Sequence, residues 1–273
     1  ILPLAVASES GLNWKDLVGS SVTISVRKDS RHLISAKKDI PVTIPLSPSL
    51  GRLLGYYASE GHIRDNRVIL TFGAREKEYA RDAAALFREI FGVDAKLRES
   101  DSKIVVEVNS KMVRVFLEDV LGLKTGAREK EVPGVILVSP VEVKIEFLKG
   151  LYRGDGCFRG GPHARLVLTT VSEKLLNGVI LLLLSLGVIP HVDMRPGGGY
   201  NIVVSYKGGL KRLSEVVQAM GGDLTECVGR SGSKLEGIPR EPAAHLAKTV
   251  GFPRRGTYTN LNKVRVSPWL SLI

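Results

Sequence analysis

Two acidic residues, Glu60 and Asp155, stand in the same local setting 95 positions apart. Each ends a helix-like run that contains apolar residues, and each is followed by a glycine. Because the C-terminal end of a helix carries about half a negative charge, an acid placed there costs roughly 0.3–1 kcal/mol. Two acids kept in unfavourable positions suggest a chemical use, and carboxylates held together are suited to binding a divalent metal.

Small residues near the acids predict how the two helices could meet. Gly55 and Ser59 lie four apart in the first run, and Gly150 and Gly154 lie four apart in the second. This spacing lets two helix backbones approach closely. If the two helices pack about a pseudo-twofold axis, their C-terminal ends lie together and the two acids become neighbours.

The predicted metal site consists of oxygen ligands at the two helix ends, from Glu60, Asp155, Ser59 and Gly154. Such ligands favour Mg²⁺, for which Mn²⁺ can substitute. Ions between two carboxylates can activate water and stabilise both oxygens of an in-line phosphodiester displacement. The expected reaction is therefore phosphodiester hydrolysis.

A repeat elsewhere in the sequence supports the pairing of the acids. Residues 91–122 and 186–221 each predict a helix end, a strand, a turn, a second strand beginning Ile-Val-Val, and another helix. The predicted fold class is α+β, with two pseudo-twofold-related αββαββα halves. The expected divisions are a basic N-terminal extension (1–46), the two halves (47–138 and 139–240), and a C-terminal helix with a basic tail (241–273).

Individual elements follow from local patterns. The pairs Ser47-Pro48 and Ser139-Pro140 predict helix starts, with serine as N-cap and proline as first helical residue. Segments 22–26, 67–72 and 164–171 predict strands, and 75–92 and 172–187 predict helices. The second of these helices is so apolar that we expect it to be buried. Three glycines at 197–199 predict a hairpin turn.

At the two acids, the sequence resembles the LAGLIDADG homing endonucleases. The name-giving nonapeptide aligns with residues 53–61 (LLGYYASEG) and 148–156 (LKGLYRGDG). The resemblance covers about residues 47–240 and identifies the chain as the monomeric, two-motif, archaeal or thermophile-like type. It implies a saddle whose two sheets straddle the DNA major groove, metals held by the acids, and cleavage at a long, asymmetric target. Glu60 departs from the usual aspartate, and Arg153 stands where the second motif often has an acid.

The resemblance also implies a basic residue near each active centre. Lys130 and Lys234 precede similar proline-containing segments and are the candidates. Aligning Pro133 with Pro239 instead places Lys234 opposite Arg128, so the assignment stays open by two residues.

DNA contacts are expected from one face of the strands, because alternate residues of a strand point to the same side. Basic side chains there can pair with guanine or meet phosphates. The candidates are Arg64, Arg67, Lys96, Arg98, Arg159, Arg165, His191 and Arg195. His62 is a candidate for supporting the first acid.

Composition agrees with a nucleic-acid partner. The 273 residues carry a formal net charge of +11, a sign that suits a polyanion. The longest apolar run, residues 179–184, is too short to span a membrane, and the two cysteines lack metal or disulfide spacing. We therefore expect an intracellular protein, nucleoid-associated through DNA. Gln218 is the only glutamine, which is typical of a thermophile.

Other functions remain open at this point. The ends Ile-Leu-Pro and Ser-Leu-Ile are not those of a complete splicing intein, although the endonuclease portion of one remains possible. An RNA-splicing maturase, with intron RNA as partner, or a non-cleaving DNA-binding protein could use the same scaffold. The basic stretch within residues 1–46 could be a solvated appendage or an additional DNA-contacting arm.

Overall fold

The computed structural model describes residues 23–25, 40–41 and 43–225, in which two halves repeat the order αββαββα. The first half contains α3 (Pro48–Glu60), β3 (Gly61–Arg64), β4 (Arg67–Gly73), α4 (Lys77–Phe91), β5 (Lys96–Glu99), β6 (Lys103–Asn109), and α5 (Lys111–Val115) continued by the π-helical turn η1 (Phe116–Val120). The second contains α7 (Val141–Asp155), β7 (Gly156–Arg159), β8 (Arg165–Thr170), α8 (Glu173–Ser185), β9 (His191–Met194), β10 (Tyr200–Val204), α9 (Lys207–Arg212) and α10 (Ser214–Ala219).

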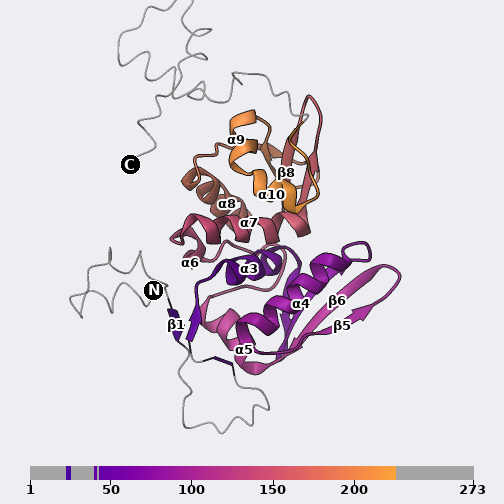
Figure 1. The fold of residues 1–273 in the computed structure, drawn as a ribbon, viewed down its shortest axis with the longest axis vertical. Helices are drawn as coiled ribbons and strands as arrows, with labels where there is room; N and C mark the ends of the chain where they lie inside the picture. The colour runs from indigo at the N-terminus through magenta and orange to yellow at the C-terminus, as the bar shows by residue number, and fades with distance from the viewer. Residues whose placement is uncertain (1–22, 26–39, 42, 226–273) are drawn as a thin grey trace, which may run out of the picture.

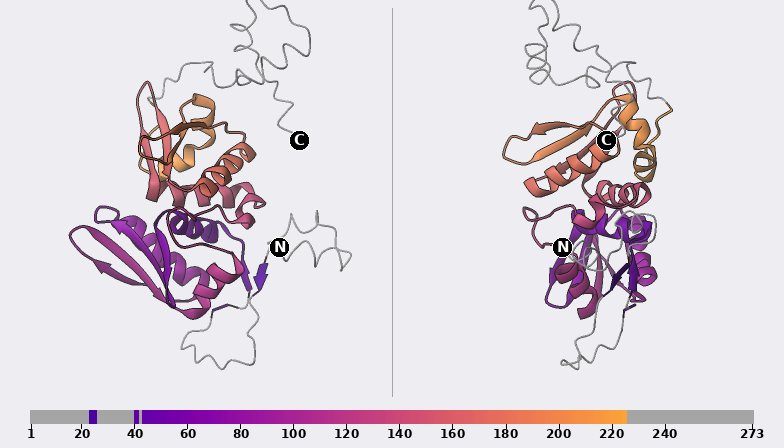
Figure 2. Two further views of the ribbon diagram at one scale, coloured as in Figure 1. Left: turned by 180° about the vertical axis from the view of Figure 1, so that it is seen from behind. Right: turned by 90° about the vertical axis from the view of Figure 1, so that its left-hand side faces the viewer.

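Each half holds one four-stranded antiparallel sheet. The strand orders are β3-β4-β6-β5 and β7-β8-β10-β9, so the two sheets have equivalent topologies. The halves lie one above the other, with α3 and α7 between them and both sheets extending toward the same side (Figure 1). Figure 2 shows the same arrangement from behind and from the side. The predicted fold class is therefore confirmed.

Two shorter elements complete the described fold. Strands β1 (Thr23–Ser25) and β2 (Thr43–Pro45) pair antiparallel ahead of α3, and β1 falls within the predicted strand at 22–26. Helix α6 (Gly134–Leu137) lies in the connection between the halves. The predicted hairpin turn is also present, because Gly197, Gly198 and Gly199 all have positive φ between β9 and β10.

Strand alternation explains how each sheet buries one face. Along β4, Val68, Leu70 and Phe72 are buried, and along β8, Leu166 and Leu168 are buried. These residues belong to one core that also includes the inner surfaces of α3 and α7. The opposite faces of the sheets are therefore left for contacts outside the core.

The start of α7 differs from the prediction. Ser47 caps α3 as expected, because its Oγ accepts a hydrogen bond from the Leu50 amide. Ser139 does not cap α7: its hydroxyl donates to the Val135 carbonyl at 2.7 Å, and Pro140 is the N-cap. The preceding short helix α6 takes up the Ser139 hydroxyl, so α7 begins one residue later.

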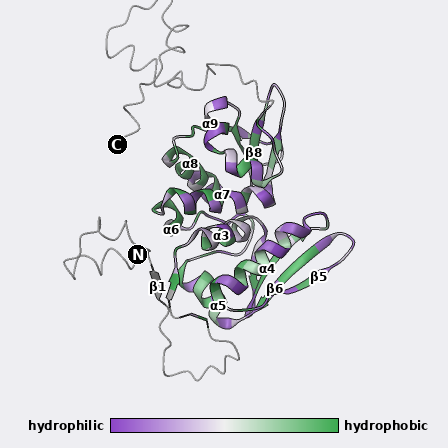
Figure 3. Ribbon diagram, viewed as in Figure 1, coloured by the Kyte–Doolittle hydropathy of each residue, from purple (hydrophilic) through white to green (hydrophobic). Residues whose placement is uncertain are grey.

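Helix α8 is less buried than its composition predicts. Its residues are mainly hydrophobic (Figure 3), and Leu175, Val179 and Leu182 are buried. Leu181 and Leu184, however, are 57% and 47% exposed. Only one face of a helix can pack on the second sheet, so the opposite face stays outside the core. In the described ranges, no helix is long and apolar enough to cross a membrane.

Candidate active site

The two motif helices touch backbone to backbone. A Cβ atom added to Gly55 would lie 2.1 Å from the Phe147 carbonyl oxygen, and one added to Gly150 would lie 2.3 Å from that of Arg52. Glycine is the residue that leaves room at these points, because any side chain would overlap the neighbouring helix. The predicted approach of the helices at small residues is present in the structure.

This packing brings the two acids to the same place. A Cβ on Gly154, next to Asp155, would lie 2.2 Å from Ser59 Oγ and 2.9 Å from Glu60 Oε1. The Glu60 carboxylate therefore reaches across to the end of α7. The Ser59 hydroxyl is occupied within its own helix, where it donates to the Gly55 and Tyr56 carbonyls at 3.3 and 3.2 Å.

Both acids have raised pKa values. Burial, followed by the charges of Asp155 and Glu76, raises the pKa of Glu60 to about 7. The pKa of Asp155, the more exposed of the two, is also raised, chiefly by loss of water around it. The positive charge of Lys130 lowers the pKa of both carboxyl groups without cancelling these shifts, and shifted carboxyl pKa values cluster at functional sites.

Glu76 is a third acid that sequence analysis did not identify. It lies in the turn between β4 and α4, and its Oε2 accepts a hydrogen bond from the Gly73 amide at 2.7 Å. Its charge contributes to the raised pKa of both Glu60 and Asp155. The residue at the same 95-residue offset is Val171, so the sequence repeat gave no signal for it.

Lys130 supplies a cation at the end of α3. Its Nζ donates to the Tyr57 carbonyl at 2.5 Å and to the Gly61 carbonyl, and lies 4.2 Å from the centre of the Tyr57 ring. The side chain is buried, and desolvation lowers its pKa to about 8, although both Asp155 and Glu60 oppose this shift. The positive charge expected at a helix C-terminus thus comes from a residue 70 positions beyond Glu60.

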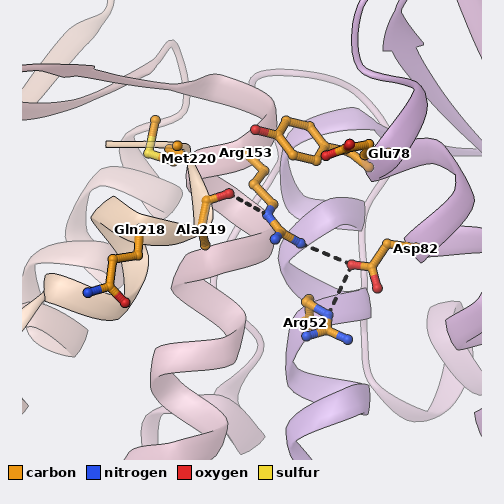
Figure 4. A pocket seen from close by; sticks show the side chains of 9 residues that line it. Arg52, Glu78, Asp82, Arg153, Gln218, Ala219 and Met220 are labelled. Carbon is orange, nitrogen blue, oxygen red and sulfur yellow. Dashed lines mark hydrogen bonds and ion pairs between the residues drawn. The ribbon is translucent and has the colours of Figure 1, made fainter. Parts of the chain in front are cut away.

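A polar network joins the halves beside this site (Figure 4). Arg153 of α7 donates to the Tyr56 hydroxyl at 2.8 Å, to Asp82 of α4 at 3.1 Å, and to the Ala219 carbonyl at 2.9 Å. Arg52 of α3 pairs with the same Asp82 at 3.1 Å. The arginine that replaces an acid in the second motif therefore ties α7 to both halves two residues before Asp155.

A family comparison agrees with this geometry. The model of the LAGLIDADG-like domain matches residues 47–120 and 142–218, so that each matched segment lies in one half and includes one of the two acids. The chain belongs to the LAGLIDADG-like domain family.

Curated relatives are much longer than this chain. The uncharacterized protein MJ1054 of Methanocaldococcus jannaschii is 27% identical over 205 residues, which are 70% of this chain and 23% of that protein. A DNA polymerase of Thermococcus sp. strain GE8 is 33% identical over 169 residues, which are 59% of this chain and 9% of that protein. The chain thus spans less than a quarter of the length of these relatives.

Solved structures similar to this chain include I-DmoI and a domain of DUF199/WhiA. I-DmoI in complex with DNA and Mn has a TM-score of 0.46 and 20% identity, covering 64% of this chain and 97% of that one. The N-terminal LAGLIDADG domain of DUF199/WhiA has a TM-score of 0.46 and 14% identity, covering 64% and 83%.

The outward face of the first LAGLIDADG sheet gathers the predicted basic residues. Strand pairing places Arg64 opposite Arg67. One set of directly paired residues crosses all four strands in the order His62, Ile69, Glu107 and Lys96. Arg98 follows Lys96 at two residues and shares its face. This face is opposite to the one that buries Val68, Leu70 and Phe72. We call it the first outward face, comprising His62, Arg64, Arg67, Lys96, Arg98 and Lys103.

The second sheet repeats this arrangement. Arg159 of β7 pairs with Arg165 of β8. His191 of β9 pairs with Val203 of β10, and Val203 pairs with Val167 of β8. Because Val167 lies two residues after Arg165, His191 is on the same face as Arg165. Arg195 lies just after β9. We call this the second outward face, comprising Arg159, Arg165 and His191, with Arg195 in the turn that follows β9.

Local ion pairs occupy some of these groups. Arg67 pairs with Asp65 and Arg98 with Glu107, and the His191 ring is hydrogen-bonded to Asp193 at 2.7 Å. The pKa of His62 is lowered by burial and by Lys130 and Arg64, which favours its neutral form. The predicted candidate Lys234, the C-terminal helix and the basic tail lie outside the described residues.

The donor set fits a hydrated divalent cation. Two carboxylates with raised pKa values lie at the adjoining ends of α3 and α7, and both are hard oxygen ligands. Within the described ranges, no group of three or more His, Cys, Asp or Glu side chains is arranged to hold a metal. The arrangement therefore suits an ion such as Mg²⁺, which keeps several waters or takes oxygens from a phosphate.

Proposed function

We propose that this chain is a site-specific double-stranded DNA endonuclease that hydrolyses phosphodiester bonds with a divalent metal. The observation that carries the proposal is the meeting of Glu60 and Asp155 across α3 and α7, at a point where Gly154 leaves no room for a Cβ. A structural role does not explain this pair, because neighbouring carboxylates at helix ends are unfavourable by themselves.

Glu60 and Asp155, with the Ser59 and Gly154 carbonyls, would hold Mg²⁺ or Mn²⁺. The metal, when bound, would lower the pKa of water and polarise the scissile phosphate. Lys130 would hold its ammonium at the end of α3, where it can stabilise negative charge on the reacting phosphate. Lys234 is proposed for the same role in the second half.

DNA would be bound along the two outward faces. Arginine and lysine there can contact guanine edges or phosphates, and the net charge of +11 favours approach to DNA. Because the two faces carry different residues, and because only the first half has an acid at the position of Glu76, we propose an asymmetric target. Both acids belong to one chain, so a monomer suffices. The division into halves at 47–138 and 139–240 is part of this proposal.

The test is cleavage of a randomised double-stranded DNA library with Mg²⁺ and with EDTA. The variants are Glu60→Gln and Asp155→Asn, with Glu89→Gln as control because Glu89 is an exposed acid on α4 that bonds only to Ser49 among the described residues. We expect metal-dependent cuts at one long motif, kept in the control and lost in both active-site variants. Tight binding without cleavage would refute the proposal and leave a DNA-binding protein; splicing of a group I intron RNA without DNA cleavage would leave a maturase.

A further inference from the structure

Lys130 belongs to the connection between the halves, yet its backbone is bound by the second half. Its carbonyl accepts a hydrogen bond from Ser172 Oγ at 2.5 Å. Ser172 is fully buried and lies immediately before α8. The lysine whose ammonium contacts the end of α3 is therefore attached, through its own carbonyl, to the start of α8.

The Ser172 hydroxyl is fixed by bonds in both directions. Its Oγ accepts from the Leu175 amide at 3.2 Å as the N-cap of α8, and it donates its proton to the Lys130 carbonyl. The Ser172 amide in turn donates to Thr170 Oγ1 at 3.1 Å. A hydroxyl held at both the donor and acceptor side has one orientation, so the position of the Lys130 carbonyl is set by α8.

A second contact with α8 is made by Val132, two residues after Lys130. A Cβ added to Gly178, in the second turn of α8, would lie 2.8 Å from Val132 Cγ2 and 2.9 Å from Val132 Cβ. The buried Val132 side chain thus rests directly on the helix backbone. Together, Ser172 and Gly178 define two points of attachment on either side of Glu131.

Other serine N-caps in the described part of the chain do not make such a contact. Ser47 accepts from the Leu50 amide and Ser110 from the Val113 amide, and these capping bonds are their only hydroxyl contacts there. The bond from Ser172 to Lys130 is therefore additional to what capping α8 requires.

We propose that Ser172, the N-cap of α8, and Gly178 within α8 are positioning residues that place Lys130 at the end of α3. The second half would thereby complete the active centre at the first motif. The effect of this positioning on catalysis rests on the proposed function. The positioning of Lys130 by Ser172 and Gly178 does not, because it depends only on contacts within the chain.

The first experiment measures positioning without any DNA. Lys130 is 6% exposed, so its amine should react slowly with an amine-acylating reagent in the native chain, as followed by peptide mass spectrometry. We expect Ser172→Ala to raise the acylation rate of Lys130 about tenfold, the equivalent of one lost hydrogen bond. Gly178→Ala should raise this rate as well, because its new methyl group would displace Val132. Ser172→Thr, which keeps the hydroxyl, should restore protection.

The matched controls are Ser110→Ala, which removes another buried N-cap, and Gly134→Ala, which adds a methyl where there is open space. Both should leave the acylation rate of Lys130 unchanged. If Ser172→Ala exposes Lys130 no more than Ser110→Ala does, the positioning inference is wrong, whether or not the chain cleaves DNA.

The second experiment is a double-mutant cycle on single-turnover cleavage. Ser172→Ala should lower the cleavage rate about tenfold in the native chain with little change in DNA binding, and should have no further effect in Lys130→Met. Equal losses in both backgrounds would overturn a role through Lys130. Absence of cleavage by the native chain, together with the acylation changes, would refute the proposed function and leave the positioning intact.

Discussion

Replacing Gly55 with alanine tests the contact on which the whole site depends. The new Cβ would lie 2.1 Å from the Phe147 carbonyl oxygen and 2.8 Å from the Leu151 amide nitrogen, whereas ordinary contacts begin near 3.4 Å. Since both neighbours are backbone atoms, they cannot rotate away. The helices would have to separate by about 1.3 Å, the difference between 3.4 and 2.1 Å.

The cost follows from this separation. Overpacking of a core typically costs about 1–3 kcal/mol. We use the upper value, about 3 kcal/mol, because the clash is with backbone atoms that cannot rotate away. Alanine's higher helix propensity returns about 1 kcal/mol, which leaves a net loss of about 2 kcal/mol. For a protein of this size, that loss corresponds to a Tm lowered by about 4–8 °C.

Thermal and urea unfolding followed by circular dichroism would measure the loss. Gly134→Ala is the control, because nothing lies within 4 Å of its added Cβ, and it should be neutral or stabilising by up to about 1 kcal/mol. A Gly55→Ala variant as stable as Gly134→Ala would refute the backbone contact between α3 and α7, and with it the meeting of the two acids.

Three further predictions concern charge. The raised pKa of Glu60 means that the native state keeps this proton to about pH 7, whereas the unfolded chain loses it near pH 4.5. Without divalent metal, the free energy of unfolding should therefore fall by on the order of 2 kcal/mol between pH 4.5 and 7. Urea unfolding of Glu60→Gln should lack most of this fall. Asp82→Asn removes the carboxylate that pairs with Arg153 and one of the two that pair with Arg52, the other being Glu146, and should cost about 1–3 kcal/mol by the same measurement. Glu129→Gln, in an exposed pair, should change stability by less than about 0.5 kcal/mol. Arg159→Ala should weaken DNA binding at low salt and reduce the slope of log affinity against log salt by about 1 if the residue contacts a phosphate; an unchanged slope would remove it from the interface.

Sequence patterns predicted the parts of this structure that depend on local spacing. The repeat at 95 residues gave both motif helices and the order of elements, and the strand alternation placed Arg64 and Arg159 on outward faces. Both features need only helix and strand periodicity and a comparison of the chain with itself.

Features that depend on long-range contacts were not predictable in the same way. Glu76 has no acidic counterpart in the repeat, and the binding of Lys130 to the Tyr57 carbonyl joins residues 73 positions apart. Aligning Pro133 with Pro239 left the equivalence of Lys130 and Lys234 uncertain by two residues. Ser139 was wrongly predicted to cap α7. Its hydroxyl can bond either to an amide of α7 or to a carbonyl of the preceding segment, and in the fold it donates to the Val135 carbonyl.

The most direct test of the account is a crystal structure grown with Mn²⁺, examined for anomalous scattering at the two helix ends. We expect an anomalous peak within metal–oxygen distance of both Glu60 and Asp155, and its loss in Asp155→Asn. Carboxylates that share only a proton or water, with no peak at saturating Mn²⁺ and bound DNA, would contradict the claim that these acids meet to hold a metal.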